Sequence, residues 1–248
     1  MLAEHRRKLI LSAVRDGSGV HVVELARRFE VSEMTVRRDL DRLARDGKLM
    51  RVHGGAVDAA EPPFAEIAVE RLDAKRRVGR AAAELVSDGD TVLVDVGTTT
   101  LELARALRGR ELTVVTSNIA VLEELLPDPL VEVVVLGGVV RRNYLSLVGV
   151  LAEDALRQLS ADVAFLGASG VREDLSIMDT TMVEVPIKRG MIAAARRSVL
   201  LVDAAKFAMQ GSVRVCGPEA LDAVVTDAAP DEARVTALVE AGVEVVHA

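Results

Sequence analysis

Aromatic residues and cysteine are scarce in this chain of 248 residues. It has no tryptophan, one tyrosine, four phenylalanines and a single cysteine, Cys216. One cysteine excludes an intramolecular disulfide and a cysteine-rich zinc site, and we expect neither a metal nor a cofactor. Half of the residues are nevertheless hydrophobic. The core must therefore be built from Val, Leu, Ile and Ala, as in buried parallel strands and the helices that cover them.

The chain also lacks the long apolar runs of membrane and secreted proteins. The first ten residues, MLAEHRRKLI, have no apolar segment behind their charges, which argues against a signal peptide. No apolar run is long enough to span a bilayer. We therefore expect a cytoplasmic protein without a membrane partner.

Positive charge is in short supply overall but is concentrated at one end. The formal net charge is −7, yet residues 1–56 hold 12 Lys and Arg against 8 Asp and Glu, a charge of +4, which leaves −11 on the remainder. DNA phosphates attract a basic segment and repel an acidic one. This asymmetry favours a DNA-binding domain over 1–56 attached to a larger acidic body.

Residues 1–56 contain three helical patterns in quick succession. The first spans 3–16 and stops at Gly17-Ser18-Gly19, and the second spans 22–29. Their apolar positions recur at helical spacing, at Ile10, Leu11 and Val14 in the first and at Val23, Leu25, Ala26 and Phe29 in the second. These faces are expected to form the core of the small domain.

Ser32 predicts the start of the third helix, over 33–45, because its hydroxyl can cap the first free amides. Val36, Leu40 and Leu43 recur at spacings of four and three and should face the core. The opposite face carries Thr35, Arg37, Arg38 and Arg42. Two short helices joined by a tight turn, the second with a polar and basic exposed face, are typical of insertion into the major groove.

A short basic hairpin is expected after the third helix. Asp46-Gly47 forms a turn, 48–53 alternates like a strand, and Gly54-Gly55 closes it. Lys48, Arg51 and His53 would then be available to phosphates or to the minor groove. Charge patterning alone fits a solvated helical bundle equally well. The order of helix, turn, capped basic helix and basic hairpin favours a winged helix-turn-helix that binds DNA.

The segment 22–56, VVELARRFEVSEMTVRRDLDRLARDGKLMRVHGGA, resembles the DNA-binding signature of the DeoR family of bacterial transcriptional repressors. The resemblance implies double-stranded operator DNA as a partner. It also implies a recognition helix on or near which Ser32, Glu33, Met34, Thr35, Arg37 and Arg38 lie. Neither the resemblance nor the helical pattern decides which of these residues touch bases and which touch phosphates.

Residues 57–70 are expected to form a linker, because Asp58 to Pro63 (DAAEPP) has no apolar periodicity and two prolines. Over 71–248 apolar strands alternate with helices. A helix with a basic start is expected first, with Arg71, Lys75, Arg76 and Arg77 ahead of Val78, Ala82, Leu85 and Val86. The strands are expected at 91–96, 112–116, 131–136, 161–166, 199–203, 223–226 and 243–246, and the further helices at 99–107, 119–126, 151–159, 185–195 and 232–241. This alternation predicts an α/β domain with a mostly parallel sheet covered by helices on both faces.

Small polar residues and glycines follow the successive strands of this body. Asp95 and Gly97-Thr98-Thr99-Thr100 lead into a helix whose free amides suit a phosphate. Later strands end in Ser117-Asn118, in Gly137-Gly138 with Arg141 and Arg142 behind, in Gly167-Ala168-Ser169-Gly170, and in Asp203 with Lys206. Each could be only a cap or a turn. Because ligands bind outside the carboxyl ends of strands in such sheets, the recurrence predicts one shared site for a small phosphorylated ligand.

The body also resembles the DeoR family, through DVGTTT, VVTSN, LGGVVR, ADVAFLGASGV, VEVPIKRGMI and LLVDAAKF. The resemblance implies a domain similar to the ribose-5-phosphate isomerase and CoA-transferase folds that binds a phosphorylated sugar. The site residues that it implies are Asp95, Gly97, Thr98, Thr99, Ser117, Asn118, Gly138, Arg141, Gly167, Ser169, Glu184, Lys188, Asp203 and Lys206, with Asp179 as a weaker candidate. This chain has Ala204-Ala205 where many relatives have two serines.

The sequence favours a transcriptional repressor of sugar-metabolism genes, not an enzyme, with operator affinity modulated by the sugar phosphate. Paired heads must follow the helical repeat of DNA, so we expect a homo-oligomer, a dimer or a tetramer. Two alternatives stay open. A sugar-phosphate isomerase would use the same carboxylates and lysine for proton transfer. A body without a ligand would serve only for assembly.

Overall fold

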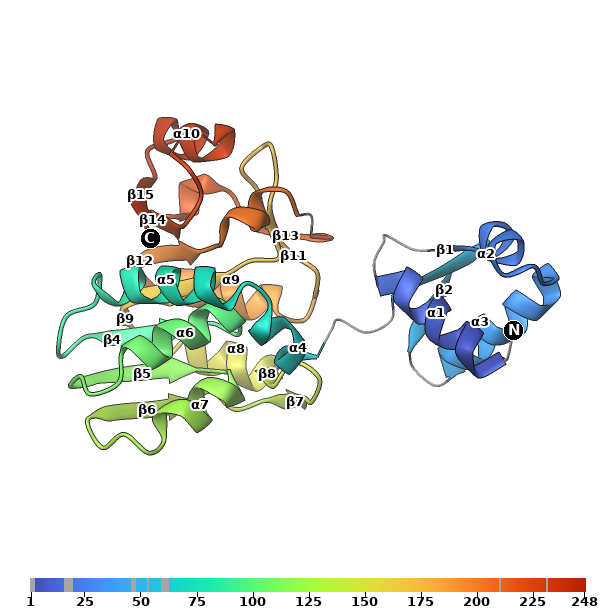
Figure 1. Ribbon diagram of the computed structural model, residues 1–248. Coiled ribbons are helices and arrows are strands. Elements are labelled where there is room, and N and C mark those ends of the chain that lie inside the picture. Colours follow the sequence, from blue (N-terminus) through green and yellow to red (C-terminus); the bar gives the residue numbers. More distant parts are fainter. Residues whose placement is uncertain are drawn as a thin grey trace. The chain divides into compact units, whose positions relative to one another are not determined.

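A computed structural model describes residues 3–15, 20–45, 48–52, 54–58, 63–209, 211–230 and 232–248. The chain divides into two compact units, Met1–Pro63 and Phe64–Ala248 (Figure 1). Each unit has hydrophobic clusters of its own. They are therefore described one at a time, as the head and the body.

The head is a winged helix-turn-helix. Its elements are α1 (Ala3–Arg15), β1 (Val20–His21), α2 (Val22–Phe29), α3 (Glu33–Arg45), β2 (Leu49–Val52) and β3 (Gly55–Asp58). The three strands form an antiparallel sheet in the order β1-β3-β2. Glu30, in the left-handed conformation, ends α2 and makes the tight turn toward α3. The three predicted helices and the hairpin are confirmed.

The core of the head contains most of the apolar residues expected there. Ile10, Val14, Val36, Leu40 and Leu43 are all buried. The prediction for Val23 was wrong, since its side chain is 63% exposed whereas that of Val22 is 2% exposed. The buried residues of α2 are Val22, Leu25 and Phe29, at helical spacings of three and four. Val23 is not at one of these spacings, so its side chain lies outside the buried face.

The segment 57–70, expected as a linker, contains regular structure at both ends. Strand β3 runs through Asp58, and α4 (Phe64–Val69) begins directly after Pro63. Phe64 is 4% exposed and belongs to a hydrophobic cluster of the body. The sequence does not predict α4, because a helix of six residues with only one fully buried residue shows no apolar periodicity.

The body is built on seven parallel strands. They are β4 (Thr91–Val94), β5 (Leu112–Thr116), β6 (Val131–Val135), β9 (Ala161–Gly167), β12 (Ala195–Leu201), β14 (Ala223–Thr226) and β15 (Glu244–His247). Their order in the sheet is β15-β14-β12-β9-β4-β5-β6, and every pair is parallel. The predicted α/β class and parallel sheet are confirmed.

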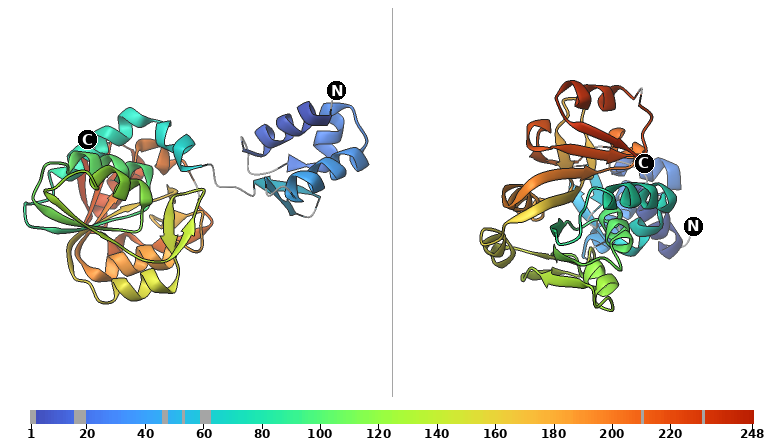
Figure 2. Two further views of the ribbon diagram at one scale, coloured as in Figure 1. Left: turned by 90° about the horizontal axis from the view of Figure 1, so that it is seen from below. Right: turned by 90° about the vertical axis from the view of Figure 1, so that its left-hand side faces the viewer.

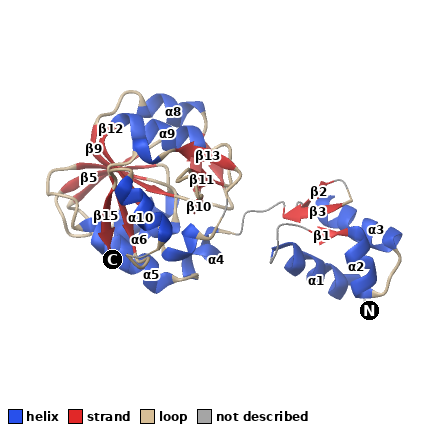
Figure 3. Cartoon of the chain, turned by 90° about the horizontal axis from the view of Figure 1, so that it is seen from above, coloured by secondary structure: helices blue, strands red, loops and turns tan. Residues whose placement is uncertain are grey.

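Helices cover both faces of this sheet (Figures 2 and 3). One hydrophobic cluster joins alternate strand residues to α5 (Leu72–Ala83), α6 (Thr98–Ala106) and α7 (Ile119–Leu125). The other joins the remaining strand residues to α8 (Val150–Leu156), α9 (Val185–Ala194) and α10 (Ala233–Glu240). Because side chains alternate across a strand, both faces of each central strand are apolar, as the continuous Val, Leu and Ala runs required.

Short strands outside the main sheet were not predicted. One hairpin consists of β7 (Val139–Arg141) and β8 (Ser146–Val148), in the stretch expected to be irregular. A second small sheet pairs β10 (Gly170–Val171), β11 (Ile177–Asp179) and β13 (Val213–Cys216), and two short 3-10 helices, η1 (Ala204–Phe207) and η2 (Pro218–Ala220), complete the body. Strands of two to four residues carry too little alternation to be recognised from sequence.

The sheet order changes direction between β4 and β9. From β4 the chain builds outward through β5 and β6, then crosses to β9 on the other side and continues through β12, β14 and β15. In open α/β sheets the ends of two such strands diverge, and this is where ligands bind. Within the part of the chain that the structure describes, no helix combines the length and apolar character needed to cross a membrane.

Candidate functional site

The third helix of the head begins at the residue that the sequence predicted as its cap. The Thr35 amide donates to Ser32 Oγ over 3.2 Å, and the two hydroxyl oxygens lie 2.9 Å apart. A capped amide removes one of the free donors at the helix start. Both hydroxyls are therefore engaged in the cap, which keeps the first turn of α3 in place.

The outward face of α3 is polar and basic, as predicted. Met34 is 57% exposed, and Arg38 and Arg42 are exposed. Arg37 pairs with Glu33 one turn earlier, over 2.7 Å, and both side chains remain about half exposed. Exposed pairs of this kind are weak. A phosphate can therefore compete with Glu33 for Arg37 at little cost.

A buried ion pair orients α3 against α1. Arg6 Nε lies 2.6 Å from Asp39 Oδ2, and both side chains are at least nine-tenths buried. The Arg7 guanidinium adds a longer contact of 3.9 Å to the other oxygen of Asp39. Sequence reasoning counted these residues only as charge. The signal that it missed is an acidic residue, Asp39, beside Leu40 on the buried face of the helix.

Of the predicted wing residues, only Lys48 is exposed without a partner among the described residues. The Arg51 guanidinium donates to the Gly55 carbonyl over 2.8 Å and lies 3.1 Å from Asp41 Oδ1 on α3. It thus ties β2 to both α3 and β3. His53 lies outside the described residues.

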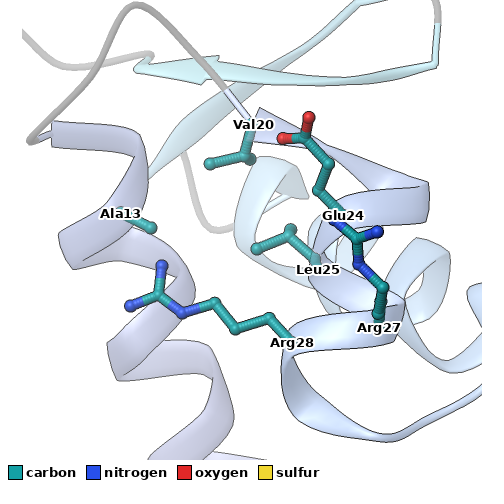
Figure 4. A pocket seen from close by; sticks show the side chains of 6 residues that line it. All are labelled: Ala13, Val20, Glu24, Leu25, Arg27 and Arg28. Carbon is teal, nitrogen blue, oxygen red and sulfur yellow. The ribbon is translucent and has the colours of Figure 1, made fainter.

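A hollow of about 400 Å³ also lies in the head, on the side of α1, α2 and β1. Figure 4 shows that Glu24, Leu25, Arg27 and Arg28 line it from α2, and Ala13 and Val20 complete the lining. None of the predicted DNA-contacting residues is among them. This hollow is therefore distinct from the exposed face of α3.

In the body, Asp95 and Gly167 end the two strands that flank the change of direction, β4 and β9. The Gly167 amide donates to Asp95 Oδ2 over 2.8 Å. Lys188 of α9 donates to the same oxygen and, over 3.0 Å, to the Gly167 carbonyl. Three of the predicted site residues therefore meet at the point where the strand order predicts a ligand site. We call the site built around them the strand-end site.

Lys188 stays charged although its side chain is only 2% exposed. Burial lowers the pKa of Lys188, but the carboxylates of Asp95, Asp179 and Glu184 raise it by more, so its pKa lies above the ordinary value. Asp179 Oδ2 is 3.4 Å away. Two carboxylates close to the ammonium group favour its charged form and hold Lys188 in place.

Glu184 lies at the start of α9 and accepts from two side chains of the β7–β8 hairpin. Ser146 Oγ of β8 donates to Glu184 Oε1 over 2.8 Å, and the Arg141 guanidinium of β7 donates to the same oxygen. Burial nevertheless raises the pKa of Glu184 to about 7, against the opposing effects of Lys188 and Arg141. The hairpin is thus attached to the strand-end site through one carboxylate that titrates near neutrality.

A cationic group surrounds Asp203, which follows β12. Arg71 Nε lies 3.1 Å from Asp203 Oδ1. Burial lowers the pKa of Lys75 to about 8 and lowers that of Lys206, and the charges of Asp203 and Arg71 act on both lysines. Asp179 also acts on Lys206, which connects this group to Lys188. Glu70 also acts on both lysines, so the three cations face the carboxylates of Asp203 and Glu70, and their clustered donors offer an anion several charge-assisted hydrogen bonds.

Two members of this group, Arg71 and Lys75, were not predicted as site residues. Arg71 lies in the joint between α4 and α5, and Lys75 lies in the first turn of α5 and is 2% exposed. A buried lysine in an otherwise amphipathic helix, Leu72 to Ala83, is the signal that could have found it. Burying its ammonium group is unfavourable unless charged or polar groups surround it, so a lysine at a buried position indicates such partners.

The predicted cradle at α6 is buried but partly engaged in its own turn. Thr98, Thr99 and Thr100 are all less than one-tenth exposed. The Thr100 hydroxyl lies within hydrogen-bond distance of the carbonyls of Asp95, at 2.7 Å, and Gly97, at 2.9 Å. It was expected to face the ligand, and instead it closes the turn. The first amides of α6 have no acceptor within the helix and stay available to a ligand.

Three buried polar atoms around the strand ends have no hydrogen-bond partner among the described residues. They are Asp95 Oδ1 after β4, Asn118 Nδ2 after β5 and Asp203 Oδ2 after β12. The second polar atom of each side chain is used, since Asp95 Oδ2 accepts from Gly167, Asn118 Oδ1 from Ala120 and Asp203 Oδ1 from Ala205. Buried polar groups are nearly always satisfied. Two acceptors and one donor are therefore left to a polar ligand.

Three other predicted residues have local structural roles. Gly138 has φ of +155°, and a Cβ there would lie 2.7 Å from the Val148 carbonyl oxygen, so the close approach of β8 requires glycine. Ser169 Oγ accepts from the Thr180 amide over 3.1 Å and lies 3.3 Å from the Thr180 hydroxyl. Ser117 is buried and its carbonyl accepts from Leu147 of β8. The described residues contain no group of His, Cys, Asp and Glu suited to a metal ion.

Known families match both units of the chain. Residues 6–61 match the DeoR-like helix-turn-helix domain, and residues 70–228 match the DeoR C terminal sensor domain. The chain belongs to the DeoR family of transcription regulators. The predicted resemblance is confirmed, and DeoR-family membership assigns the head to DNA binding and the body to sensing.

Curated DeoR-type relatives are similar over nearly their whole length. The glycerol-3-phosphate regulon repressor of Escherichia coli K12 is 32% identical over 93% of this chain and 93% of that protein. The HTH-type transcriptional regulator YgbI of the same organism is 34% identical over 97% and 96%, and a putative aga operon transcriptional repressor of Escherichia coli O157:H7 is 31% identical over 97% and 92%. These names describe regulators of transcription, as predicted, and not enzymes.

Solved structures with partial likeness include an isomerase. Ribose 5-phosphate isomerase A from Methanocaldococcus jannaschii has 18% sequence identity and a TM-score of 0.42 over 56% of this chain and 55% of that chain.

Proposed function

We propose that this DeoR-family regulator is a repressor whose strand-end site binds a phosphorylated sugar and thereby changes the affinity of α3 for operator DNA. The observation that carries the proposal is the set of unpartnered buried atoms, Asp95 Oδ1, Asn118 Nδ2 and Asp203 Oδ2, beside a cationic group. A ligand with several hydroxyl groups and one strong negative charge matches both features. Relatives named for a glycerol-3-phosphate regulon and for a sugar operon support the same class.

The charges suggest which way the ligand lies. Arg71, Lys75 and Lys206 gather around Asp203, whereas Asp95 and Asp179 surround Lys188. A phosphate is favoured at the first group, where one guanidinium and two ammonium groups lie together and can donate to the same anion. Sugar hydroxyls are favoured near Asp95 and Asn118, because hydroxyls both donate and accept. The free amides at the start of α6 offer a further contact to either end.

The proposed DNA contact is the exposed face of α3. Met34, Arg37, Arg38 and Arg42 point away from the core, and the cap at Ser32 and the ion pair at Asp39 hold this face in place. Helices of this kind insert into the major groove, and two heads on one assembly follow the DNA repeat. A dimer or a tetramer is therefore proposed as the working form.

A thermal-shift screen of the full-length protein tests the sensor. The compounds are glycerol 3-phosphate, ribose 5-phosphate, glucose 6-phosphate and fructose 6-phosphate, each with its unphosphorylated counterpart as a control. A compound that binds only the native state raises its stability, by about 2.7 kcal/mol at one hundred times Kd. We expect one phosphate ester to stabilise the protein and its unphosphorylated counterpart to have no effect.

Matched arginine variants show whether binding occurs at the strand-end site. Arg71→Gln removes a cation beside Asp203, and Arg80→Gln removes an exposed arginine from α5, the helix that Arg71 precedes. We expect Arg71→Gln to weaken the response at least about tenfold in compound concentration, the effect of losing one charge-assisted hydrogen bond. Arg80→Gln should respond as the wild type does. Equal responses of the two variants, or no response of the wild type to any phosphate, would exclude this site as a sugar-phosphate sensor.

A further inference from the structure

We propose that two parts of the strand-end site hold α4, the helix that joins the linker to the body: Glu184 with the β7–β8 hairpin, and the cationic group around Asp203. Through these contacts α4 transmits the occupancy of the strand-end site to the head. This inference rests on the proposed sensor function. Figure 1 shows α4 as the first element of the body after the thin grey trace, next to β8. Within the body, α4 is thus the element nearest in sequence to the DNA-binding unit.

The first residue of α4 is attached to the β7–β8 hairpin. The Phe64 amide donates to the Asn143 carbonyl over 2.9 Å, and the Phe64 ring meets the Tyr144 ring edge-on, with centroids 5.6 Å apart. Asn143 and Tyr144 form the connection between β7 and β8. The Arg141 guanidinium lies 5.7 Å from the centroid of the Tyr144 ring and also binds Glu184. One chain of contacts thus runs from Glu184 to Phe64.

The other end of α4 is attached to the cationic group. The Lys75 ammonium donates to the Ile67 carbonyl of α4. Lys75 is buried, and the charges of Asp203, Lys206 and Arg71 all act on its ammonium group. An anion bound among these cations competes with the Ile67 carbonyl for the protons of Lys75. The strength of the hydrogen bond between Lys75 and the Ile67 carbonyl therefore depends on whether an anion occupies the site.

The joint between α4 and α5 is conformationally strained. Arg71 has φ of 48°, in the left-handed region that non-glycine residues seldom adopt, and it contacts Asp203 through its side chain. Such a conformation persists only where surrounding contacts enforce it. A ligand that takes over the Asp203 contact removes one of those restraints. The joint is thus suited to two arrangements.

Helix α4 has little stability of its own. It has six residues, of which only Phe64 is fully buried, and Val69 is 70% exposed. A helix this short does not persist without tertiary contacts. Phe64 and Ala68 pack on a hydrophobic cluster of the body, and the Phe64 contact with the hairpin and the Lys75 contact with Ile67 add the polar and aromatic links that reach the strand-end site.

Hydrogen exchange of the full-length protein tests the inference. The probe is the phosphate ester with the largest thermal shift, and the readout is amide exchange in peptides covering 64–70. We expect the probe to change exchange in this segment although no side chain of α4 belongs to the proposed site. Phe64→Ala should make these amides exchange at least about tenfold faster and insensitive to the probe, with probe affinity within about threefold of wild type.

Two further variants separate coupling from general destabilisation. Val69→Ala truncates an exposed apolar residue of the same helix and should behave as the wild type does. Tyr144→Leu removes the hairpin side of the ring contact and should reproduce Phe64→Ala, which keeps the test valid if Phe64→Ala does not fold. A probe that binds without altering exchange at 64–70 overturns the inference and leaves the sensor standing. Failure of every phosphate ester to bind overturns the sensor, and the inference with it.

Discussion

At the scale of single residues, burial decides the chemistry of the strand-end site. Glu184 is 2% exposed and accepts from Ser146 and Arg141, yet burial raises its pKa to about 7. Lys188 is equally buried, but the carboxylates around it raise its pKa and keep it charged. The difference follows from the number of opposite charges in contact with each group. One residue is therefore a fixed charge and the other a titrating group.

Glu184 predicts a specific dependence of stability on pH. Its pKa in the folded state is raised from 4.5 to about 7, so its favourable contribution is fully present below about pH 4.5 and is lost as pH rises through about 7. Between these pH values the unfolding free energy of the wild type should fall by up to about 3 kcal/mol more than that of Glu184→Gln, which cannot titrate. Urea unfolding of the full-length protein at pH 5, 6, 7 and 8 measures it.

The control for this experiment is Glu173→Gln, which changes an exposed carboxyl. It should leave the pH dependence of the wild type unchanged. If Glu184→Gln and the wild type lose stability in parallel as pH rises, the raised pKa of Glu184 is wrong.

At the scale of elements, a buried ion pair joins α3 to α1 beside the apolar packing of Val36, Leu40 and Leu43. Arg6 and Asp39 join α1 to α3 across the core of the head, with a contact of 2.6 Å. Burying two charges is unfavourable in itself, and the pair offsets this only while both partners are present. The exposed face of α3 therefore relies on a contact that lies on the opposite side of the helix.

We expect Asp39→Leu to destabilise the head by about 3 to 5 kcal/mol, because it leaves Arg6 buried without its main partner. Combining it with Arg6→Met should restore most of that stability. Hydrogen exchange of the amides of α1 and α3 in the full-length protein reports on the head separately from the body. A double variant as unstable as Asp39→Leu would show that the pair contributes more than charge compensation.

Elements were predicted well where a periodic apolar pattern was long enough. Helices α2 and α3 and strands β5 and β14 have the predicted bounds, and the other main strands and helices differ by a few residues at their ends. The pattern failed for α4, for the β7–β8 hairpin and for β10, β11 and β13. These elements are short, and distant contacts such as Phe64 with Tyr144 determine where they form.

At the scale of the whole molecule, charge is distributed unevenly along the chain, with an excess of positive charge over residues 1–56. Residues 1–56 carry +4 and the remainder −11. Attraction to DNA is therefore confined to the head, and exposed arginines of the body should contribute nothing to it. This division gives a direct test of which surface binds DNA.

Removing positive charge from α3 should weaken operator binding and reduce its salt dependence. The plot of log affinity against log salt concentration has a negative slope. Arg37→Gln and Arg38→Gln should each make this slope less steep by about 1 for each DNA phosphate that the arginine no longer neutralises. Arg196→Gln, an exposed arginine of the body, should leave both affinity and slope unchanged. The measurement is fluorescence anisotropy with an operator selected from random DNA by the purified protein. Unchanged affinity of both α3 variants would exclude this face as the DNA contact.

The sequence alone determined what depends on local pattern: a capped basic helix at Ser32, a parallel α/β body, and polar residues after successive strands. Helical and strand periodicity and capping chemistry are properties of neighbouring residues, so they can be recognised without a structure. Tertiary structure decided which of the predicted side chains are available. It engaged Thr100, Ser169 and Arg51 in local contacts, brought Arg71 and Lys75 to Asp203, and left Asp95, Asn118 and Asp203 with unpartnered atoms. The contacts of Thr100, Ser169 and Arg51 join residues close in the chain, and the folded backbone decides which of their polar atoms are used. Arg71 and Asp203 are far apart in the chain, so no local pattern encodes their contact.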